Sequence, residues 1–270
     1  MNGNATTRHS NAALLSVAST MADRVTTSAS IDEKLLPVLK RLKMPTGLLQ
    51  RVAGVHERRN WGPDQSFDDA AIDAGRRALA EAGVRPDQVG LLINTSVTRP
   101  HLEPSVAVRL HHGLGLPSSA TNFDIANACL GFVNGMTLAS QLIDAGQIDY
   151  AVIIDGEDAD DVQVNTIDRL LTEGFDRDDF MSEFASLTLG SGAAAAVIGR
   201  ADRHPEDTAS SAGSPGRPPR TTTSASAAST ACSPMPRPCS SAAWSSSSRP
   251  GRRRSATGTG RAWTATSCTR

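Results

Sequence analysis

The sequence lacks the marks of several large classes of protein. No apolar run approaches the roughly 20 residues that cross a bilayer, and a formal net charge of −1 gives no general attraction to nucleic acid or to a membrane surface. The N-terminus, MNGNATTRHS, has no apolar stretch behind a basic start, so we see no secretion signal. The four cysteines have neither zinc-ligand spacing nor the density of a disulfide scaffold. We expect a cytoplasmic protein with reduced thiols, without a metal site, a nucleic-acid partner or a membrane span.

The residues after Thr208 lack almost every side chain from which a core is built. Leu, Ile, Val, Phe and Tyr are absent there, as are Lys, Asn, Gln and His, and six small, polar or basic types make up nearly all of the segment. Such a composition cannot bury enough apolar surface to offset an ordering cost of roughly 1–2 kcal/mol per residue. We therefore expect residues 1–204 to fold and residues 205–270 to form a low-complexity, disordered segment.

The same composition also fits a shifted reading frame. Ser, Pro, Arg, Ala, Thr and Gly are what GC-rich coding DNA yields when the frame slips. Codons can be chosen for Pro238–Pro250 that spell an amphipathic helix two nucleotides along, and in the alternative frame Trp263–Arg270 can spell a strand that runs into a histidine. Because codon choice is free, the frameshift is a hypothesis, and the genomic sequence of the locus tests it.

The first two hundred residues alternate between helix and strand patterns. Near-continuous apolar runs such as QVGLLINTSV and DYAVIID are typical of strands buried on both faces of a sheet. The alternation predicts an α/β protein, layered around a central sheet. The expected strands are Ala12–Ser19, Gln88–Val97, Ala120–Ile125, Asp149–Asp155 and Ala193–Gly199. The expected helices are Ser30–Lys43, a helix from Ser66 or Asp68 to Gly83, Pro104–Leu114, Ala128–Ala145 and Asp178–Ser186, and Val52–Trp61 is expected to be a polar loop.

Cys129 lies where a predicted strand hands over to a predicted helix, in the segment Asp124–Phe132 (DIANACLGF). Thiolate is the reactive form of cysteine, and the unpaired N–H groups and positive dipole end of a helix N-terminus favour it. The same N–H groups can stabilise the oxyanion that forms when a thiolate attacks a thioester carbonyl. Gly131 lets the backbone approach closely just after the thiol. We interpret Cys129 as an acyl-accepting nucleophile, and the alternative is an inert core thiol.

The segment around Cys129 resembles the active-site segment of the ketoacyl synthase III branch of the thiolase superfamily. Four further motifs resemble that branch in order and spacing: LLINTSVT (Leu91–Thr98), EPSVA (Glu103–Ala107), DYAVIIDGE (Asp149–Glu157) and LGSGAAAAV (Leu189–Val197). The resemblance runs from about Ala12 to Arg200. It implies a thiolase-like fold, layered α-β-α, of which only the N-terminal repeat is present. It also implies that an acyl-CoA or acyl carrier protein thioester acylates Cys129, with no cofactor besides these substrates, in a homodimer.

Glu103 indicates which enzymes of this branch the chain resembles most. Typical ketoacyl synthase III enzymes have an apolar residue here, lining the acyl pocket of the neighbouring subunit. A glutamate resembles OleA-type enzymes, which join two fatty acyl-CoA molecules head to head on the way to long-chain olefins. A Claisen condensation without decarboxylation needs a base for the α-proton, whereas decarboxylation of a malonyl thioester makes the carbanion without one. We expect Glu103 to be that base, and the alternative is a solvated residue at a helix N-terminus.

The remaining candidate residues carry less information. Arg58 and Arg59 are candidates for binding the phosphates of coenzyme A, and the alternative is a surface loop. The acidic run Asp155–Asp161 is interpreted as a solvated loop, because a cation site needs ligands at defined offsets. Ser191 is expected to make a tight turn, since its GSG setting is not that of a hydrolase nucleophile.

Three functions remain open from the sequence. The first is an OleA-type condensing enzyme, the second a ketoacyl synthase III that starts fatty-acid or polyketide chains, and the third a non-catalytic fragment or partner subunit. The family also uses a His and an Asn from the second repeat, whereas this sequence has no His after His204 and no Asn after Asn165. We therefore expect the chain to be unstable or prone to aggregate, and at best to accept an acyl group on Cys129 without condensing it.

Overall fold

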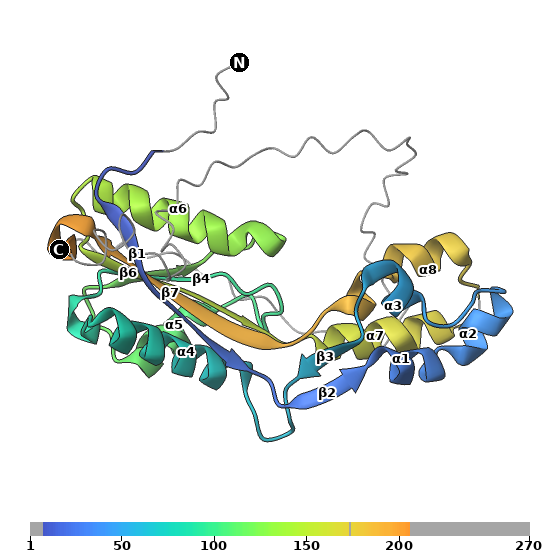
Figure 1. Cartoon of the computed structure of the whole chain (residues 1–270). Helices are drawn as coiled ribbons and strands as arrows, with labels where there is room; N and C mark the ends of the chain where they lie inside the picture. Colours follow the sequence, from blue (N-terminus) through green and yellow to red (C-terminus); the bar gives the residue numbers. More distant parts are fainter. Residues whose placement is uncertain (1–7, 173, 206–270) are drawn as a thin grey trace, which may run out of the picture. The chain divides into compact units, whose positions relative to one another are not determined.

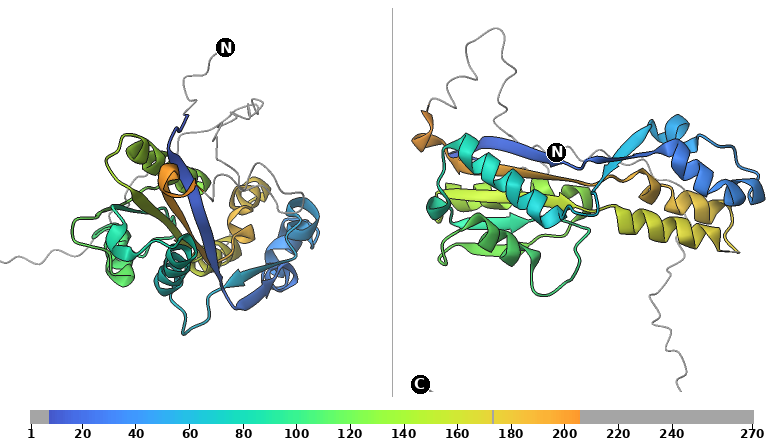
Figure 2. Two further views of the ribbon diagram at one scale, coloured as in Figure 1. Left: turned by 60° about the vertical axis from the view of Figure 1, so that its left-hand side comes forward. Right: turned by 90° about the horizontal axis from the view of Figure 1, so that it is seen from below.

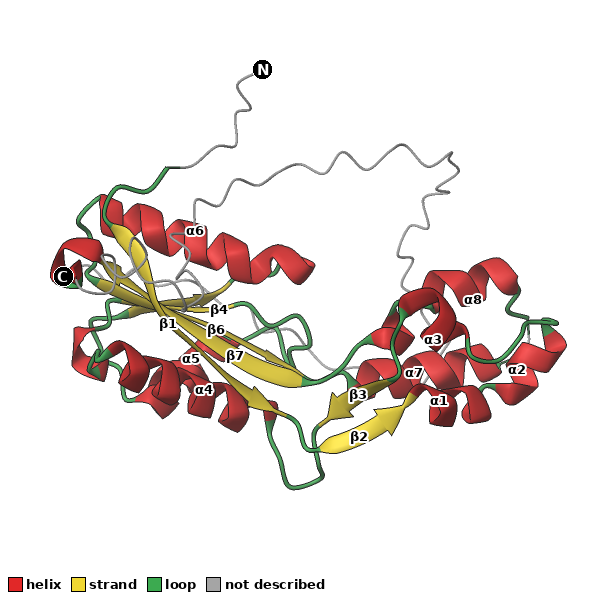
Figure 3. Cartoon of the chain, in the orientation of Figure 1, coloured by secondary structure: helices red, strands yellow, loops and turns green. Residues whose placement is uncertain are grey.

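The computed structural model of the chain describes residues 8–172 and 174–205 (Figure 1). The predicted disorder of the segment after Pro205, and the shifted frame suggested for it, lie outside the described residues. The described chain contains the layered α/β arrangement that the sequence predicts, with a mixed sheet at its centre (Figure 3).

The central sheet has five strands in the order β1-β7-β6-β4-β5. Strands β4, β5 and β6 are parallel, and Ile93 of β4 lies opposite Phe123 of β5 and Ile153 of β6. Strand β7 is antiparallel to both of its neighbours, β1 and β6. All five strands expected from the sequence form, with bounds β1 Ala12–Met21, β4 Leu91–Asn94, β5 Thr121–Asp124, β6 Tyr150–Glu157 and β7 Gly192–Arg200.

Helices cover both faces of this sheet, α4 (Phe67–Ala82) and α5 (Val106–Leu114) on one face and α6 (Gly131–Asp144) on the other (Figures 1 and 2). Successive side chains of a strand point to opposite faces. Accordingly Val152 and Ile154 of β6 join the core under α4 and α5, whereas Ala151 and Ile153 join the core under α6. Such burial on both faces explains why the central strands read as continuous apolar runs.

A second group of elements builds its own small core. It contains the two-stranded ribbon of β2 (Arg24–Thr27) and β3 (Glu57–Asn60). Its helices are α1 (Ser28–Lys34), α2 (Leu36–Arg41), α3 (Leu48–Ala53), α7 (Asp160–Leu171) and α8 (Arg177–Glu183). The buried side chains of this core include Leu35, Leu39, Leu49, Leu170, Phe180 and Leu187. The described residues also form four short 3₁₀ turns, η1 Pro86–Gln88, η2 Ala128–Leu130, η3 Ser186–Thr188 and η4 Ala201–Arg203.

The structure corrects three local predictions. The single helix expected over Ser30–Lys43 is two helices that meet at Leu35, with Pro37 in the first turn of the second, where a missing N–H costs least. The expected loop Val52–Trp61 contains β3, whose polar sequence ERRN becomes a strand only by pairing with β2. The acidic run is not a loop, because β6 continues through Glu157 and α7 begins at Asp160.

Within the described ranges, we find no helix with the length and apolar character needed to cross a bilayer.

Candidate active site around Cys129

Cys129 lies in η2, between the end of β5 and the start of α6, and its side chain is exposed. This position is at the carboxyl edge of the three parallel strands, where Asn94 of β4 pairs with Asp124 of β5. Ligands of open α/β sheets bind in the crevice outside the carboxyl ends of the strands. The strand–turn–helix setting predicted for the cysteine is therefore confirmed, although the first turn is 3₁₀ and the α-helix begins two residues later.

The turn that carries Cys129 has an uncommon backbone conformation. Ala128 adopts φ of 44°, in the left-handed region that residues with a side chain rarely enter. A conformation of this kind costs on the order of 1–3 kcal/mol and persists only where the surroundings fix it. The Asn127 side chain supplies one such restraint, because its Nδ2 donates to Asn134 Oδ1 of α6 at 2.6 Å. Nothing in the sequence marked this turn, since alanine gives no signal for a left-handed residue.

Helix α6 approaches the sheet closely just behind the nucleophile. A Cβ on Gly131 would lie 3.3 Å from the Thr95 carbonyl oxygen and 3.4 Å from that of Ile125. The N-cap residue is Leu130, whose side chain has no hydrogen-bond acceptor. It therefore cannot cap the first-turn N–H groups as Ser or Asp would. N–H groups of this kind, beside an exposed thiol, can bind the oxyanion of a tetrahedral intermediate.

Glu103 lies in the segment between β4 and α5, residues 95–105, which we call the Glu103 loop. Its side chain is exposed, and among the described residues no hydrogen bond joins it to Cys129. The structure thus places the predicted base on the loop that leaves the carboxyl end of β4, next to the strand that leads to the nucleophile. Its catalytic role stays a prediction.

Two buried or half-buried carboxylates hold the Glu103 loop. Glu157, at the end of β6, accepts the backbone N–H groups of Val97 at 2.7 Å and Thr98 at 2.9 Å. Asp124, at the end of β5, accepts from Arg99 Nη1 at 3.1 Å and from Asn94 Nδ2 at 3.0 Å. We predicted no role in the site for either carboxylate from the sequence, although Asp124 lies within a predicted strand and Glu157 lies two residues after another.

Asp155 is a third carboxyl group at this edge. Burial raises its pKa to about 6, a hydrogen bond from Thr95 opposes the shift, and the neighbouring Glu157 adds to it. Thr95 Oγ1 donates to Asp155 Oδ2 at 2.7 Å, and the backbone of the same threonine lies against Gly131 at the start of α6. A carboxyl group with a raised pKa is therefore hydrogen-bonded to Thr95, the residue whose backbone packs against the start of α6 next to Cys129.

Arg58 and Arg59 occupy different environments on β3. The Arg58 side chain is 5% exposed, which excludes the surface loop considered as an alternative, and burial lowers its pKa. Its guanidinium donates to Ser28 Oγ at 2.9 Å and to the Thr26 carbonyl at 3.3 Å. Arg59 is 42% exposed, with Glu57 at 3.9 Å, and is the more accessible of the two to a phosphate. Neither arginine is hydrogen-bonded to Cys129 or Glu103 in the described chain.

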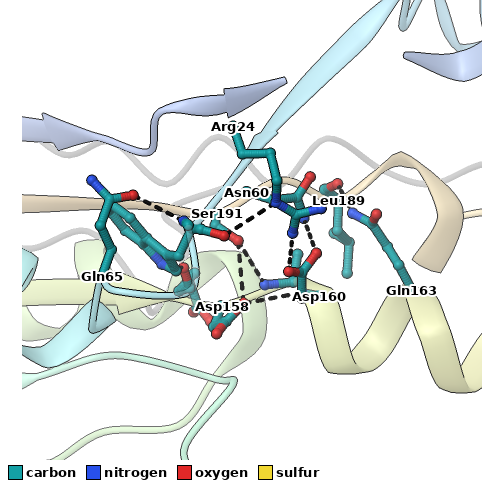
Figure 4. Close-up of polar contacts among 12 residues, drawn as sticks. Arg24, Asn60, Gln65, Asp158, Asp160, Gln163, Leu189 and Ser191 are labelled. Carbon is teal, nitrogen blue, oxygen red and sulfur yellow. Dashed lines mark hydrogen bonds and ion pairs between the residues drawn. The ribbon is translucent and has the colours of Figure 1, made fainter. Parts of the chain in front are cut away.

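The acidic residues after β6 form a polar cluster with β2, β3 and the start of β7 (Figure 4). Asp160 accepts from Asn60 Nδ2 at 2.7 Å and pairs with Arg24. Ser191 Oγ accepts from the Ala159 N–H at 3.0 Å and donates to Asp158 Oδ1 at 3.4 Å. These groups are engaged with one another, so the predicted solvated loop is wrong. No set of three or more His, Cys, Asp or Glu side chains suited to a metal ion occurs among the residues that the structure describes.

Comparison with known proteins finds a matching family model and several similar enzymes. Residues 123–216 match the family model described as 3-oxoacyl-[acyl-carrier-protein] synthase III. The acyl-CoA:acyl-CoA alkyltransferase of Xanthomonas campestris is 42% identical over 196 residues, which are 73% of this chain and 58% of that protein. The enzyme of the same name from Shewanella oneidensis is 32% identical over 191 residues, 71% of this chain and 54% of that protein. The chain therefore spans little more than half the length of these relatives.

Solved structures show the same relationship. The acetamide-bound crystal structure of Xanthomonas campestris OleA matches with a TM-score of 0.70 at 42% identity, covering 73% of this chain and 61% of that one. A cysteine-to-serine variant of the same enzyme, with bound lauric acid and lauroyl-CoA, matches with a TM-score of 0.69 at 41% identity, covering 74% and 59%. Over the matched part, the chain is thus similar in sequence to the 3-oxoacyl-ACP synthase III family and has its thiolase-like fold.

Proposed function

We propose that the chain is a condensing enzyme of the OleA type, in which Cys129 accepts an acyl group from a fatty acyl-CoA. The observation that carries the proposal is the setting of Cys129: an exposed thiol on a strained turn, at the carboxyl edge of the sheet, in front of a helix without a side-chain cap. The names of the relatives, acyl-CoA:acyl-CoA alkyltransferases, support the substrate class.

The first half-reaction is acyl transfer. The Cys129 thiolate attacks the thioester carbonyl, first-turn N–H groups of α6 stabilise the oxyanion, and coenzyme A leaves as its thiolate. One thioester is exchanged for another, so the free-energy change of the step is close to zero and no cofactor is needed. Arg59 is the better candidate of the two arginines for contact with the phosphates of coenzyme A, because it is exposed whereas Arg58 is not.

The second half-reaction of an OleA-type enzyme is carbon–carbon bond formation, which we do not expect this chain to complete by itself, because it has no His after His204 and no Asn after Asn165. Glu103 removes an α-proton from a second acyl-CoA, the carbanion attacks the acyl-Cys129 carbonyl, and Cys129 leaves as thiolate. Structures of OleA variants altered at a glutamate and at a cysteine support this assignment. Those two positions are separated in OleA by the same number of residues as Glu103 and Cys129. A homodimer in the cytoplasm, with acyl thioesters as its only small-molecule partners, completes the proposal.

A ketoacyl synthase III activity is the second candidate, because the family model that matches the chain carries that description. The β-ketoacyl-[acyl-carrier-protein] synthase III of an Enterobacter is 34% identical over 101 residues. The two candidates differ in acyl chain length and in the source of the carbanion. Glu103 favours the first, since only a condensation without decarboxylation needs a base at the α-carbon.

One experiment separates the candidates. The full chain is incubated with lauroyl-CoA or acetyl-CoA, then with either more lauroyl-CoA or a malonyl carrier protein. Released coenzyme A, acyl-enzyme and β-keto products are measured by mass spectrometry. We expect acyl transfer from lauroyl-CoA and no response to malonyl carrier protein. Transfer from acetyl-CoA followed by condensation with malonyl carrier protein would favour ketoacyl synthase III, and the absence of any acyl-enzyme would favour a non-catalytic subunit.

A further inference from the structure

Asp124 makes an unusual set of contacts for a strand-end carboxylate. Its side chain is 7% exposed and accepts four hydrogen bonds. Two come from side chains, Asn94 Nδ2 at 3.0 Å and Arg99 Nη1 at 3.1 Å. The other two come from the backbone N–H groups of Val106 at 3.1 Å and Ala107 at 3.0 Å, which begin α5. These bonds outweigh the effect of burial and hold the pKa of Asp124 below its usual range.

These contacts fall on both sides of Glu103. Arg99 precedes it in the Glu103 loop, and Val106 and Ala107 follow the loop directly. One carboxylate therefore closes residues 99–106 into a ring, with Glu103 on the part of the ring that is exposed. Closing a short segment at both ends removes most of its conformational freedom, so the position of the side chain at its tip depends on the closure.

The same carboxylate also belongs to the segment of the nucleophile. Asp124 is the last residue of β5, and η2 with Cys129 follows after three residues of connection. Charge adds to the geometry: a carboxylate at the N-terminus of α5 interacts favourably with the helix dipole, and Arg99 is 17% exposed, so its pairing with Asp124 is little screened.

We propose that Asp124 is the positioning residue of the base, a buried carboxylate that clamps both ends of the Glu103 loop to the strand that carries the nucleophile. The inference rests on the proposed function in so far as Glu103 is the base. All four hydrogen bonds of Asp124 go to the protein, so we assign it to positioning and not to contact with the substrate.

The first test reads the position of the loop and needs no activity. Amide hydrogen exchange by mass spectrometry is compared between the full wild-type chain, Asp124→Asn and Arg99→Ala. We expect exchange of residues 97–107 to accelerate about tenfold or more in Asp124→Asn, because charged acceptors are lost. Arg99→Ala, which leaves the α5 cap in place, should accelerate the N-terminal side of the loop only.

Asp144→Asn is the matched control for this experiment. Asp144 also gathers backbone N–H groups, those of Ser10, Asn11 and Ala12, but at the far end of α6. Its substitution should accelerate exchange near Ala12 and leave the Glu103 loop unchanged. Unchanged loop exchange in both Asp124→Asn and Arg99→Ala would overturn the proposal, as would equal acceleration in Asp144→Asn.

The second test separates positioning from general damage to the fold. The chain is acylated with lauroyl-CoA in D₂O, and deuterium at the α-carbon of free and enzyme-bound acyl groups is measured. We expect Asp124→Asn and Glu103→Gln to lower α-deuteration by a similar factor, about tenfold or more, while acylation of Cys129 changes less than about threefold. Equal loss of acylation and α-deuteration in Asp124→Asn would contradict a positioning role.

The two tests fail in distinguishable ways. If the wild-type chain shows no α-deuteration, or Glu103→Gln leaves it unchanged, the proposed role of Glu103 fails, and the exchange experiment still decides whether Asp124 clamps the loop. If Glu103→Gln abolishes α-deuteration and Asp124→Asn leaves it at the wild-type level, the proposed function survives and the positioning role does not.

Discussion

At the scale of single residues, the site contains a close approach at Gly131 that leaves little room for a Cβ. Gly131 lies between two carbonyl oxygens, those of Thr95 and Ile125, and neither can move without moving a strand end. A structural biologist reading the sequence could suspect a role for this glycine from its place after Cys129. The identity of the opposing atoms, and the left-handed Ala128 beside them, depend on tertiary packing that no local pattern reports.

Replacement of Gly131 by alanine tests this contact. A Cβ would be 3.3 Å from the Thr95 oxygen, so we expect Gly131→Ala to lower the free energy of unfolding by about 1–2 kcal/mol and to slow acylation of Cys129. Chemical denaturation and the rate of acyl-enzyme formation are the measurements. Gly192→Ala is the control, since its nearest neighbour is the Thr20 oxygen at 3.9 Å, an ordinary contact. If the two variants behave alike, close packing at Gly131 is not what matters.

Asp155 gives a prediction about pH at the same scale. Its pKa in the fold, about 6, is above the ordinary value of 3.8, so the folded state holds this proton more tightly than the unfolded chain. The free energy of unfolding therefore falls as pH rises from about 4 to about 6. Above that range, the whole cost of burying the ionised Asp155 is subtracted from the stability of the fold. We expect Asp155→Asn to raise the free energy of unfolding by on the order of 2 kcal/mol at about pH 8 and to change it little at about pH 4.

Urea denaturation of wild-type and variant chains at both pH values measures this difference. Glu81→Gln, an exposed carboxyl group on α4, is the control for removing one negative charge. A variant that is equally stabilised at both pH values would show that packing, and not the charge of Asp155, accounts for the effect.

At the scale of elements, the strands of the central sheet were predictable and the β2–β3 ribbon was not. The run Leu91–Asn94 is apolar because both of its faces are covered, and that requirement is visible in the sequence. The segment Glu57–Asn60 is polar, and it forms a strand only because Arg24–Thr27 pairs with it. Helix α7 was missed for a similar reason, since Asp160 in its acidic first turn pairs with Arg24, which is distant in the sequence.

The attachment of β1 to α6 gives a prediction about elements. Asp144, at the end of α6, accepts the N–H groups of Asn11 at 2.7 Å and Ala12 at 3.0 Å, and His9 Nδ1 lies 3.0 Å away. Burial opposes the charged form, but these hydrogen bonds prevail and lower the pKa of Asp144. The stabilisation is thus present above the ordinary value of 3.8 and is lost as pH falls below it.

We expect Asp144→Asn to lower the free energy of unfolding by about 1–3 kcal/mol at neutral pH and by less below about pH 3. Denaturation curves recorded over this range measure it. The clearest contrary result is a variant with the wild-type pH profile, which would mean that other carboxyl groups account for acid sensitivity.

At the scale of the whole molecule, the described residues contain an acyl acceptor and a candidate base but expose several large apolar side chains. Leu130 and Val133 of the α6 region are 60% and 43% exposed, and Val17 and Met21 of β1 are 55% and 66% exposed. The relatives continue beyond the matched region, which is 58% of the Xanthomonas campestris enzyme. Exposed apolar surface of this kind promotes association, so we expect the purified 270-residue chain to associate in a concentration-dependent way, as sedimentation velocity can measure.

The central claim, that Cys129 accepts an acyl group, is tested most directly by intact-mass and peptide mass spectrometry after incubation with lauroyl-CoA. We predict one lauroyl adduct on the peptide that contains Cys129, and none in Cys129→Ala. The other three cysteines, Cys232, Cys239 and Cys268, serve as internal controls in the same chain. A chain that remains unmodified, or that is acylated equally on all four cysteines, would contradict the assignment of Cys129 as the nucleophile.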